Sequence, residues 1–296
     1  MKIAVIGTNG LLSDSIGRYC NKYNYHLAMY GLTKPEGHAY NSFNPANLIY
    51  EELDYNELMH SELIVYAAGS GIQSHLKENA ALIYTLNVTV PVKICNDLKS
   101  NGYTGVFVSF GSYFEIGENM ENYFFTEIEL LQSQRKVVND YSVSKRMFSR
   151  FISSVGMPFK TWHFILPTIY GEKEAPNRLI PYTIHALKTN SNFSYTSGEQ
   201  IRQYIYVDEV ADIIFKAFDA NISSGLYNIS GTETMTVKEL ISLLFALHNR
   251  TLPETVFGKT ERTDTGMKNL QLNGQKLKQA IAYQSKIKIT DVYDRY

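Results

Sequence analysis

An apolar run that passes directly into a glycine-rich turn constrains the fold of this chain more than any other feature. Residues 2–6, Lys-Ile-Ala-Val-Ile, form a short β-branched run that is typical of a strand buried on both faces. The turn Gly7-Thr-Asn-Gly10 follows at once, and residues 11–22 have the pattern of a helix. Gly7 permits a tight turn, Gly10 lets the backbone approach a pyrophosphate, and N–H groups at the helix N-terminus favour an anion. This segment predicts the first βα unit of a dinucleotide-binding domain.

The alternation of strand and helix patterns continues to about residue 166. Strands are expected at 25–30, 63–68, 104–109 and 161–166, and helices at 76–98, with a kink at Pro91, and at 137–155. Such alternation predicts an α/β fold with a Rossmann-type, doubly wound parallel sheet, which binds its ligands at the carboxyl ends of the strands.

Beyond Pro167 the rhythm loosens, and the sequence predicts a smaller, mixed α/β C-terminal substrate lobe. The expected elements are a helix at 179–188, a strand at 204–207 and a helix that runs from its cap at Asp208 to Phe218. A further helix is expected to end at Leu247, and the capping box Thr236-Val-Lys-Glu239 marks its start. We expect residues 1–166 to form the dinucleotide-binding domain, with residues 204–220 returning to it. Residues 167–296 are expected to form mainly the nucleotide-sugar-binding lobe.

Charge and composition argue against several classes of protein. The net charge of −1 gives no long-range attraction to nucleic acid or to an anionic membrane. The two cysteines, Cys20 and Cys95, lie far apart, which favours reduced thiols in a cytoplasmic protein. No apolar run approaches about 18 residues, and the seven histidines show no close ligand spacing. We therefore expect neither a membrane span nor a metal site.

The end of the second expected strand bears on the choice of cofactor. An acidic residue about 20 positions beyond the glycine turn holds the ribose 2′-hydroxyl of NAD. Residues 29–34, Met-Tyr-Gly-Leu-Thr-Lys, contain no acid, and Lys34 is a candidate partner for the 2′-phosphate of NADP. The alternative is that Lys34 is only a solvated loop lysine. We expect NADP as the preferred cofactor, with NAD as the alternative.

The motif Tyr141-Ser-Val-Ser-Lys145 places a phenol and an ammonium one turn apart on one face of the expected helix. A cation at about 4 Å supplies energy of the order needed to lower a tyrosine pKa by about 3 units, so the pair could move a proton to or from a sugar oxygen. The spacing occurs about once by chance in a chain with 22 tyrosines, and the helical setting separates this pair from a chance one. Ser109 and Ser112, near the end of the preceding strand, compete for the role of a carbonyl-binding hydroxyl.

Together these segments resemble the extended short-chain dehydrogenase/reductase family, in particular its NAD(P)-dependent nucleotide-sugar epimerase, dehydratase and ketoreductase group. The resemblance covers nearly the whole chain. The matching segments are, in chain order, Gly7-x-x-Gly10-x-x-Ser13, Ala67-Ala68, Asn87, Gly111-Ser112-Tyr-Phe-Glu-Ile-Gly117, Tyr141 with Lys145, Leu166-Pro-Thr-Ile-Tyr-Gly171, Asn177-Arg-Leu-Ile-Pro181, Gly198-Glu-Gln-Ile-Arg202-Gln-Tyr-Ile-Tyr-Val-Asp208, Tyr227-Asn-Ile-Ser-Gly231 and Arg262-Thr-Asp264.

The resemblance implies roles for individual residues. It puts Ser112 rather than Ser109 into the catalytic group with Tyr141 and Lys145, because residues 111–117 resemble the family's Ser-Ser-x-x-Val-Tyr-Gly stretch. The implied cofactor contacts are Gly7, Asn9, Gly10, Leu11, Leu12, Lys34, Ala67, Ala68, Gly69, Pro167 and Thr168, and the implied substrate contacts are Asn177, Arg202 and Arg262.

Three departures from the family pattern stand out. Ser13 replaces a glycine, which is expected to move the helix slightly away from the pyrophosphate. Gln203 stands where an aspartate is usual, which puts the substrate contacts nearby in doubt. The segment from Gln275 to Tyr296 lacks the usual Leu-Gly-Trp ending.

The residues after Ser112 bear on the reaction. Dehydratases of this group have Asp-Glu there, whereas this chain has Tyr113 and Phe114, so 4,6-dehydration is not expected. Epimerisation beside a keto group needs an acid/base pair, for which Tyr113 and Cys95 are conceivable members without further support. Segments 31–34, 196–202 and 257–262 look most like the reductases that make CDP-linked dideoxy sugars for bacterial surface polysaccharides, including lipopolysaccharide.

The resemblance therefore implies NADPH-dependent reduction of a 4-keto group on a nucleoside-diphosphate 6-deoxy or dideoxy sugar, by a cytoplasmic homodimer. Tyr141 would protonate the forming alkoxide, Lys145 would lower the pKa of Tyr141, and Ser112 would bind the carbonyl oxygen. Arg202 and Arg262 would bind the diphosphate, because the arginine fork matches phosphate oxygens. An NAD-dependent nucleotide-sugar 4-epimerase and a non-catalytic NADP-binding regulator stay open as alternatives.

Overall fold

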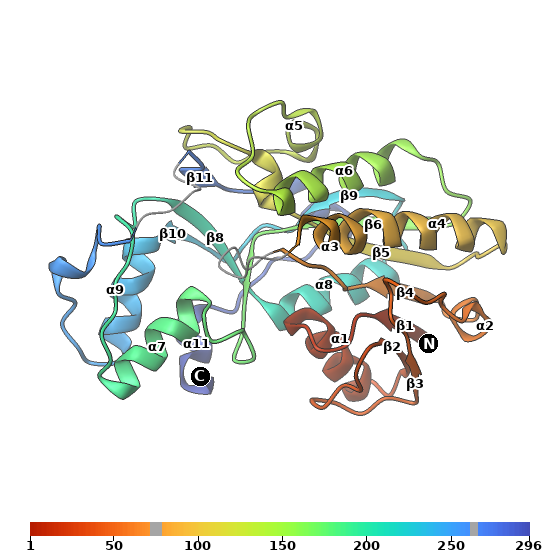
Figure 1. Cartoon of the computed structure of the whole chain (residues 1–296), viewed down its shortest axis with the longest axis horizontal. Helices are drawn as coiled ribbons and strands as arrows, with labels where there is room; N and C mark the ends of the chain where they lie inside the picture. The colour runs from red at the N-terminus through yellow and green to blue at the C-terminus, as the bar shows by residue number, and fades with distance from the viewer. Residues whose placement is uncertain (72–78, 261–265) are drawn as a thin grey trace.

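A large parallel sheet forms the centre of the molecule (Figure 1). The computed structural model describes residues 1–71, 79–260 and 266–296. Within these residues the large sheet has seven strands in the order β3-β2-β1-β4-β5-β6-β9, and every neighbouring pair is parallel. The strands are β1 (Lys2–Ile6), β2 (His26–Gly31), β3 (Ser42–Pro45), β4 (Leu63–Tyr66), β5 (Val106–Ser112), β6 (Lys160–Leu166) and β9 (Gly225–Asn228). The expected doubly wound sheet is confirmed, and its strand order reverses between β1 and β4.

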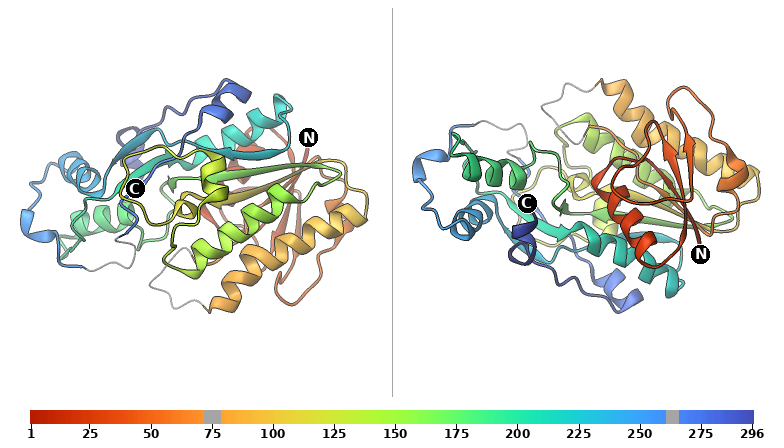
Figure 2. Two further views of the ribbon diagram at one scale, coloured as in Figure 1. Left: turned by 90° about the horizontal axis from the view of Figure 1, so that it is seen from above. Right: turned by 90° about the horizontal axis from the view of Figure 1, so that it is seen from below.

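Helices cover both faces of this sheet, as the two views of Figure 2 show. Successive side chains of β1 point to opposite faces. Ile3 and Val5 pack with α1 (Leu11–Lys22) and α8 (Val207–Asp219), whereas Ala4 and Ile6 pack with α4 (Val90–Ser100) and α6 (Asp140–Ser154). Burial on both faces explains why the strands read as apolar runs without alternation.

Several element boundaries differ from the expectation. The strand expected at 104–109 runs from Val106 to Ser112, which makes Ser112 its last residue. The helix expected at 76–98 is described from residue 80, as α3 (Ala80–Tyr84), a π-helical turn (Thr85–Thr89) and α4, and the backbone stays helical at each junction. The irregular turn ends just before Pro91, where the sequence predicts a kink. Residues 76–78 of that expected helix lie outside the described part of the chain.

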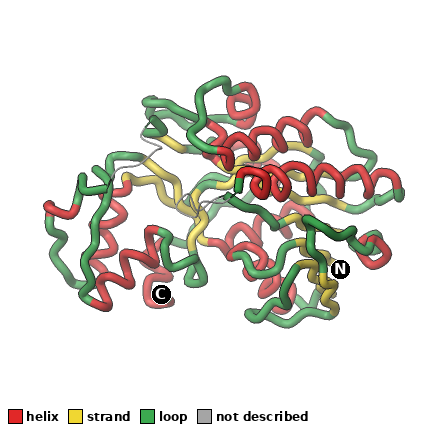
Figure 3. Tube along the Cα trace, in the orientation of Figure 1, coloured by secondary structure: helices red, strands yellow, loops and turns green. Residues whose placement is uncertain are grey.

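A smaller mixed sheet carries the second lobe, at the left of Figure 3. In the described residues, β8 (Ile201–Tyr206) pairs with β7 (Thr168–Tyr170), β10 (Glu233–Thr236) and β11 (Asn269–Leu270), and the β10 pairing is antiparallel. A core between this sheet, α7 (Leu179–Thr189) and α9 (Val237–Leu247) holds the lobe together. The remaining helices are α2 (Tyr55–Leu58), α5 (Glu127–Gln132), α10 (Gln275–Ile281) and α11 (Ile289–Val292), with 3-10 turns at Tyr113–Ile116, Glu254–Val256 and Tyr293–Arg295.

Helix termini test two of the expected caps. The expected box at α9 is present, because the Thr236 amide donates to Glu239 at 2.7 Å and the Glu239 amide donates to the Thr236 hydroxyl at 3.1 Å. The expected cap at Asp208 is wrong. The first helical residue of α8 is Val207, and Asp208 instead accepts hydrogen bonds from Ser15 and Arg18 of α1, so it joins two helices. None of the described helices has the length and apolar character needed to cross a bilayer.

Replacing Thr236 by alanine removes the hydroxyl that accepts from the Glu239 amide. We expect the free energy of unfolding to fall by about 1 kcal/mol, the usual cost of a lost N-cap, in a urea titration followed by circular dichroism. Thr236→Ser keeps the oxygen and serves as the control. Equal stability of the alanine and serine variants would contradict this account of how α9 begins.

Candidate active site

The glycine turn after β1 packs tightly against the segment that follows β4. Gly7 has φ +105°, and a Cβ atom there would lie 2.7 Å from the Ala68 nitrogen, so no side chain fits. Ser13, which departs from the family's glycine, is buried in α1, and its hydroxyl accepts from the Gly10 amide at 3.0 Å and reaches the Thr8 carbonyl at 3.1 Å. Ser13 therefore fastens the turn to the helix that it opens.

Two adjoining cavities open at the carboxyl ends of β1, β4 and β5. The first, of about 430 Å³, is lined by Asn9, Gly10, Leu11, Leu12, Ala67, Ala68 and Gly69, all expected cofactor contacts. The second, of about 310 Å³, is lined by Ser112, Pro167, Thr168, Asn177 and Arg202 among others. Tyr141, Lys145, Glu174 and Arg178 line both cavities. Residues expected to contact cofactor and residues expected to contact substrate therefore face two spaces that meet at the tyrosine–lysine pair.

Helix α6 presents the tyrosine–lysine pair to the point where the cavities meet. The Asn139 side chain caps this helix by accepting from the Ser142 amide at 2.9 Å. Lys145 Nζ donates to the Phe110 carbonyl at 2.9 Å and lies 5.8 Å from the centroid of the Tyr141 ring. The Ser112 hydroxyl hydrogen-bonds the Tyr141 side chain. The three residues that the resemblance grouped as catalytic are thus brought together.

The electrostatics of the pair differ from the expectation that the lysine lowers the tyrosine pKa. Burial raises the pKa of Tyr141 to about 12, although the hydrogen bond with Ser112 opposes the rise. Burial lowers the pKa of Lys145 to about 8, against the attraction of Glu115. Burial thus has the largest effect on the Tyr141 pKa, and Lys145 bonds a backbone carbonyl rather than the phenol. At neutral pH the phenol keeps its proton, so Tyr141 can act as a proton donor.

Asn87 and Tyr113 hold the walls of the cavities in place. The Asn87 amide donates to the Ser70 carbonyl and to the Ser144 hydroxyl, both at 2.9 Å, which ties the segment after β4 to α6. Tyr113, which stands where dehydratases have an aspartate, is buried and its hydroxyl hydrogen-bonds Thr168. Sequence reasoning placed Asn87 by the family resemblance alone, and the contacts now give it a structural task.

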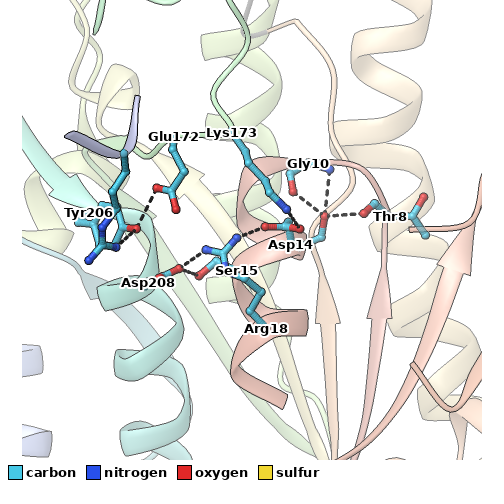
Figure 4. A network of polar contacts seen from close by, with 11 residues as sticks. Thr8, Gly10, Asp14, Ser15, Arg18, Glu172, Lys173, Tyr206 and Asp208 are labelled. Carbon is cyan, nitrogen blue, oxygen red and sulfur yellow. Dashed lines mark hydrogen bonds and ion pairs between the residues drawn. The ribbon is translucent and has the colours of Figure 1, made fainter. Parts of the chain in front are cut away.

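A polar network joins the segment after β7 to the start of α1 (Figure 4). Lys173 points toward Asp14 and forms an ion pair with it at 2.8 Å. Arg18 lies between Asp14 and Asp208 and pairs with both. The neighbouring Glu172 accepts from the Tyr206 hydroxyl at 2.9 Å. The network fixes Lys173 at the wall of the first cavity, beside Gly10 and Leu11.

Sequence reasoning missed Lys173, Glu174 and Arg178. Arg178 Nε donates to Glu174 at 3.3 Å, and the Glu174 carboxyl also accepts from the Tyr296 hydroxyl at 2.9 Å. Burial raises the pKa of Glu174, while Arg178 opposes the rise. The four-residue spacing of Glu174 and Arg178 was a signal that could have found them, since it follows directly on the segment expected to close over the nicotinamide.

Some expected site residues lie apart from the cavities or outside the described chain. Lys34 is exposed and is not among the residues that line either cavity. Arg262 lies outside the described residues. Gln203, where an aspartate is usual, is buried and accepts from the Leu272 amide at 2.9 Å, so its side chain holds a neighbouring segment. The described residues contain no group of three or more His, Cys, Asp or Glu side chains that could hold a metal ion.

The sheet order, the glycine turn and the tyrosine–lysine helix together indicate an enzyme that uses a nicotinamide dinucleotide. The chain belongs to the NAD dependent epimerase/dehydratase family, whose model matches residues 3–230. Two curated relatives are CDP-abequose synthases. That of Salmonella typhimurium is 26% identical over 255 residues, which cover 80% of this chain and 79% of the relative. That of Salmonella muenchen is 26% identical over 166 residues, which cover 54% of this chain and 52%, or about half, of the relative.

A solved structure with the same fold is MoeE5 in complex with UDP-glucuronic acid and NAD. It superimposes with a TM-score of 0.82 over 100% of this chain and 97% of MoeE5, at 15% sequence identity. At that identity the likeness establishes the fold, which agrees with the extended short-chain dehydrogenase/reductase architecture expected from the sequence.

Lys173→Met removes a positive charge from the wall of the first cavity and leaves Asp14 with Arg18 as its partner. We expect the dissociation constant for a nicotinamide dinucleotide to rise about three- to tenfold, since a cation near the diphosphate is lost. Nicotinamide fluorescence measures the constant. Lys99→Met, at an exposed site on α4, is the matched control, and equal binding by both variants would show that Lys173 does not serve the cofactor.

Proposed function

We propose that the protein reduces the 4-keto group of a nucleoside-diphosphate 6-deoxy or dideoxy sugar with NADPH. The observation that carries the proposal is the position of Tyr141 and Lys145, which line both cavities at once. A raised tyrosine pKa also suits a reductase, because a reduction needs a protonated donor beside the forming alkoxide. The two CDP-abequose synthases among the relatives favour a CDP-linked substrate. A task in surface-polysaccharide synthesis in the cytoplasm is part of the proposal, as the family resemblance implies.

Each residue of the catalytic group has a distinct task in this proposal. A bound nicotinamide cofactor supplies the hydride. The Tyr141 hydroxyl donates its proton to the sugar oxygen at C4, and the Ser112 hydroxyl donates a hydrogen bond to the same oxygen. Lys145, as a cation, stabilises the phenolate that remains on Tyr141. The burial that raises the Tyr141 pKa also limits the access of water to this step.

The second cavity suits a diphosphate and its sugar. Arg202 is 4% exposed, and Nη1 of its guanidinium donates to the Ile201 carbonyl at 2.8 Å, which fixes the plane of the group at the cavity wall. Asn177 and Arg178 line the same cavity. We assign diphosphate binding to Arg202 and Arg262, as the family resemblance implies, and add Arg178 because it lies closest in sequence to Asn177 and lines both cavities.

The loop after β2 supports NADP but also offers the alternative. Asn9, in the first cavity, donates to the Thr33 hydroxyl, which keeps the adjacent Lys34 near the cofactor end of β2. We therefore keep Lys34 as the partner of the 2′-phosphate. Glu36, two residues further on, lines a further cavity of about 340 Å³ with Asn9 and Gly10 and could instead accept from the 2′-hydroxyl of NAD.

That position of Glu36 is the observation that favours a second candidate, an NAD-dependent nucleotide-sugar 4-epimerase. Epimerisation beside a keto group is less well supported. Cys95 packs in the core beneath the sheet, where burial raises its pKa to about 12, and Tyr113 bonds Thr168. A non-catalytic regulator is the least favoured alternative, because the full catalytic group is present.

Met147 on α6 is 48% exposed, which suits the homodimer that we expect through this helix.

Activity is expected to fall as pH rises through about 8. Burial lowers the pKa of Lys145, so the lysine is a cation below about 8 and neutral above it, and the neutral form no longer stabilises the Tyr141 phenolate. The pH profile of kcat/KM, measured with a CDP-4-keto-6-deoxy sugar, should therefore be flat near neutrality and decline on the alkaline side.

Tyr141→Phe should lower kcat by about 100-fold or more. A phenylalanine variant as active as the wild type would exclude the assigned proton donor.

Lys34→Ala tests the choice of cofactor. The wild type should bind NADPH about tenfold more tightly than NADH, and the substitution should remove this preference by weakening only NADPH binding. NADH, which lacks the 2′-phosphate, is the internal control in a titration followed by nicotinamide fluorescence. If the wild type binds NADH as well as NADPH, Lys34 has no part in recognition and the epimerase becomes the leading candidate.

A further inference from the structure

A buried acid lies directly behind the catalytic group, and the proposed reaction gives it no task. Glu115 is 1% exposed and sits on the 3-10 turn that follows β5. Its Oε1 accepts from the amide of Ser112 at 2.8 Å. Buried carboxylates are costly unless they are paired and hydrogen-bonded, so a full set of partners is expected around this one.

The partners form a hydrogen-bonded chain beneath the site. Ser149 hydrogen-bonds the Glu115 carboxylate, and its hydroxyl lies 2.9 Å from His163 Nε2. His163 Nδ1 lies 2.8 Å from the hydroxyl of Ser109, which itself lines the first cavity. Burial, together with Lys145, lowers the pKa of His163 to about 3, so the ring is neutral, with one donor and one acceptor nitrogen.

The direction of this chain follows from the carboxylate at its end. In its ionised form Glu115 only accepts, and with Ser149 as its donor the chain runs from the Ser109 hydroxyl to His163 Nδ1 and from His163 Nε2–H to Ser149. Each buried donor in the chain then has an acceptor. This arrangement also explains why Ser109, the rival of Ser112 in the sequence, is not needed as a carbonyl-binding hydroxyl.

Gly111 makes room for the acid. A Cβ atom at this position would lie closest to Ile165 Cδ1, and 2.6 Å from Glu115 Oε1 and 2.8 Å from His163 Nε2. The Glu115 carboxylate, His163 and Ile165 together fill the space that a side chain at position 111 would need.

Two opposite charges act on the same strand end. Lys145 donates to the carbonyl of Phe110, and Glu115 accepts from the amide of Ser112, so the two side chains hold the peptide groups on either side of Gly111. The other charged or titratable groups that face Glu115 are Arg146, whose Nε donates to the Glu115 carbonyl at 2.7 Å, and Tyr141. Burial raises the pKa of Glu115, while the Ser112 amide, Ser149, Lys145 and Arg146 favour its ionised form.

We propose that Glu115 is a positioning residue of the active centre, which fixes the strand end that carries Ser112 and serves as the buried counter-charge of Lys145. Its kinetic consequence rests on the proposed reductase function. The effect of Glu115 on the charge of Lys145 is independent of the reaction that the protein catalyses. The two proposals can therefore be tested separately.

Two substitutions separate the effect of the Glu115 charge from the effect of the length of its side chain. Glu115→Gln keeps an acceptor oxygen for the Ser112 amide but removes the charge, whereas Glu115→Asp keeps the charge but is too short to reach that amide. The pKa of Lys145 is read directly by carbon-13 NMR of the reductively dimethylated protein, with Lys145→Arg for assignment. We expect the glutamine variant to lower the Lys145 pKa by about one unit, and the alkaline limb of the kcat/KM profile to move with it. The aspartate variant should leave the Lys145 pKa in place and lower kcat/KM about tenfold.

Glu129→Gln is the matched control, because Glu129 accepts from the Thr126 amide at 2.8 Å in a similar turn far from the cavities, and it should move neither quantity. If Glu115→Gln does not fold, Glu115→Val is also uncharged and should shift the Lys145 pKa in the same direction. A Lys145 pKa that is unchanged in an uncharged variant overturns the proposal. A wild type that reduces no 4-keto nucleotide sugar contradicts the proposed function, and the NMR comparison then still decides the role of Glu115.

Discussion

The close passage of Gly7 against the backbone of Ala67 and Ala68 sets the geometry on which the site depends. No side chain fits there, so β1 and β4 end side by side and the first turn of α1 faces the cavity between them. The switch in strand order lies at the same place, which is where open α/β sheets bind their ligands. Ser13 then fastens the turn to α1, and the ion pair of Lys173 with Asp14 joins the second lobe to it. The cofactor cavity is therefore assembled from contacts between segments far apart in the sequence.

Burial favours the uncharged form of both ionisable side chains of the catalytic group. It raises the pKa of Tyr141 and lowers that of Lys145, so both neutral forms are favoured relative to water. A tyrosine that keeps its proton suits reduction, but a lysine that lost its charge would not help. Glu115 opposes that loss from behind the strand end, and its partners Ser149 and His163 make its burial tolerable. Proton donation and retained positive charge thus depend on different neighbours.

Much of the fold could be predicted because buried parallel strands read as apolar runs and the glycine turn marks the first crossover. The edge strand β3 was missed because its residues are only half buried and carry no apolar run. The length of β5 was underestimated because Gly111 interrupts the pattern, although it belongs to the strand. In the site, Tyr141 and Lys145 were found because their four-residue spacing falls on a well-patterned helix after the fourth strand. Glu115 was missed because an acid reads as a surface residue, and its burial follows only from tertiary contacts with α6 and β6.

The most direct test of the central claim follows the hydride itself. NADPH carrying deuterium at both positions of C4 of the nicotinamide is incubated with the protein and a CDP-4-keto-6-deoxy sugar, and the product is analysed by mass spectrometry and NMR. The account predicts one deuterium at C4 of the sugar for each NADPH oxidised. Recovery of the 4-keto sugar without deuterium and without consumption of NADPH would contradict it. Inversion at C4 of a CDP-6-deoxy sugar that carries a 4-hydroxyl, again without net consumption of cofactor, would then establish an epimerase.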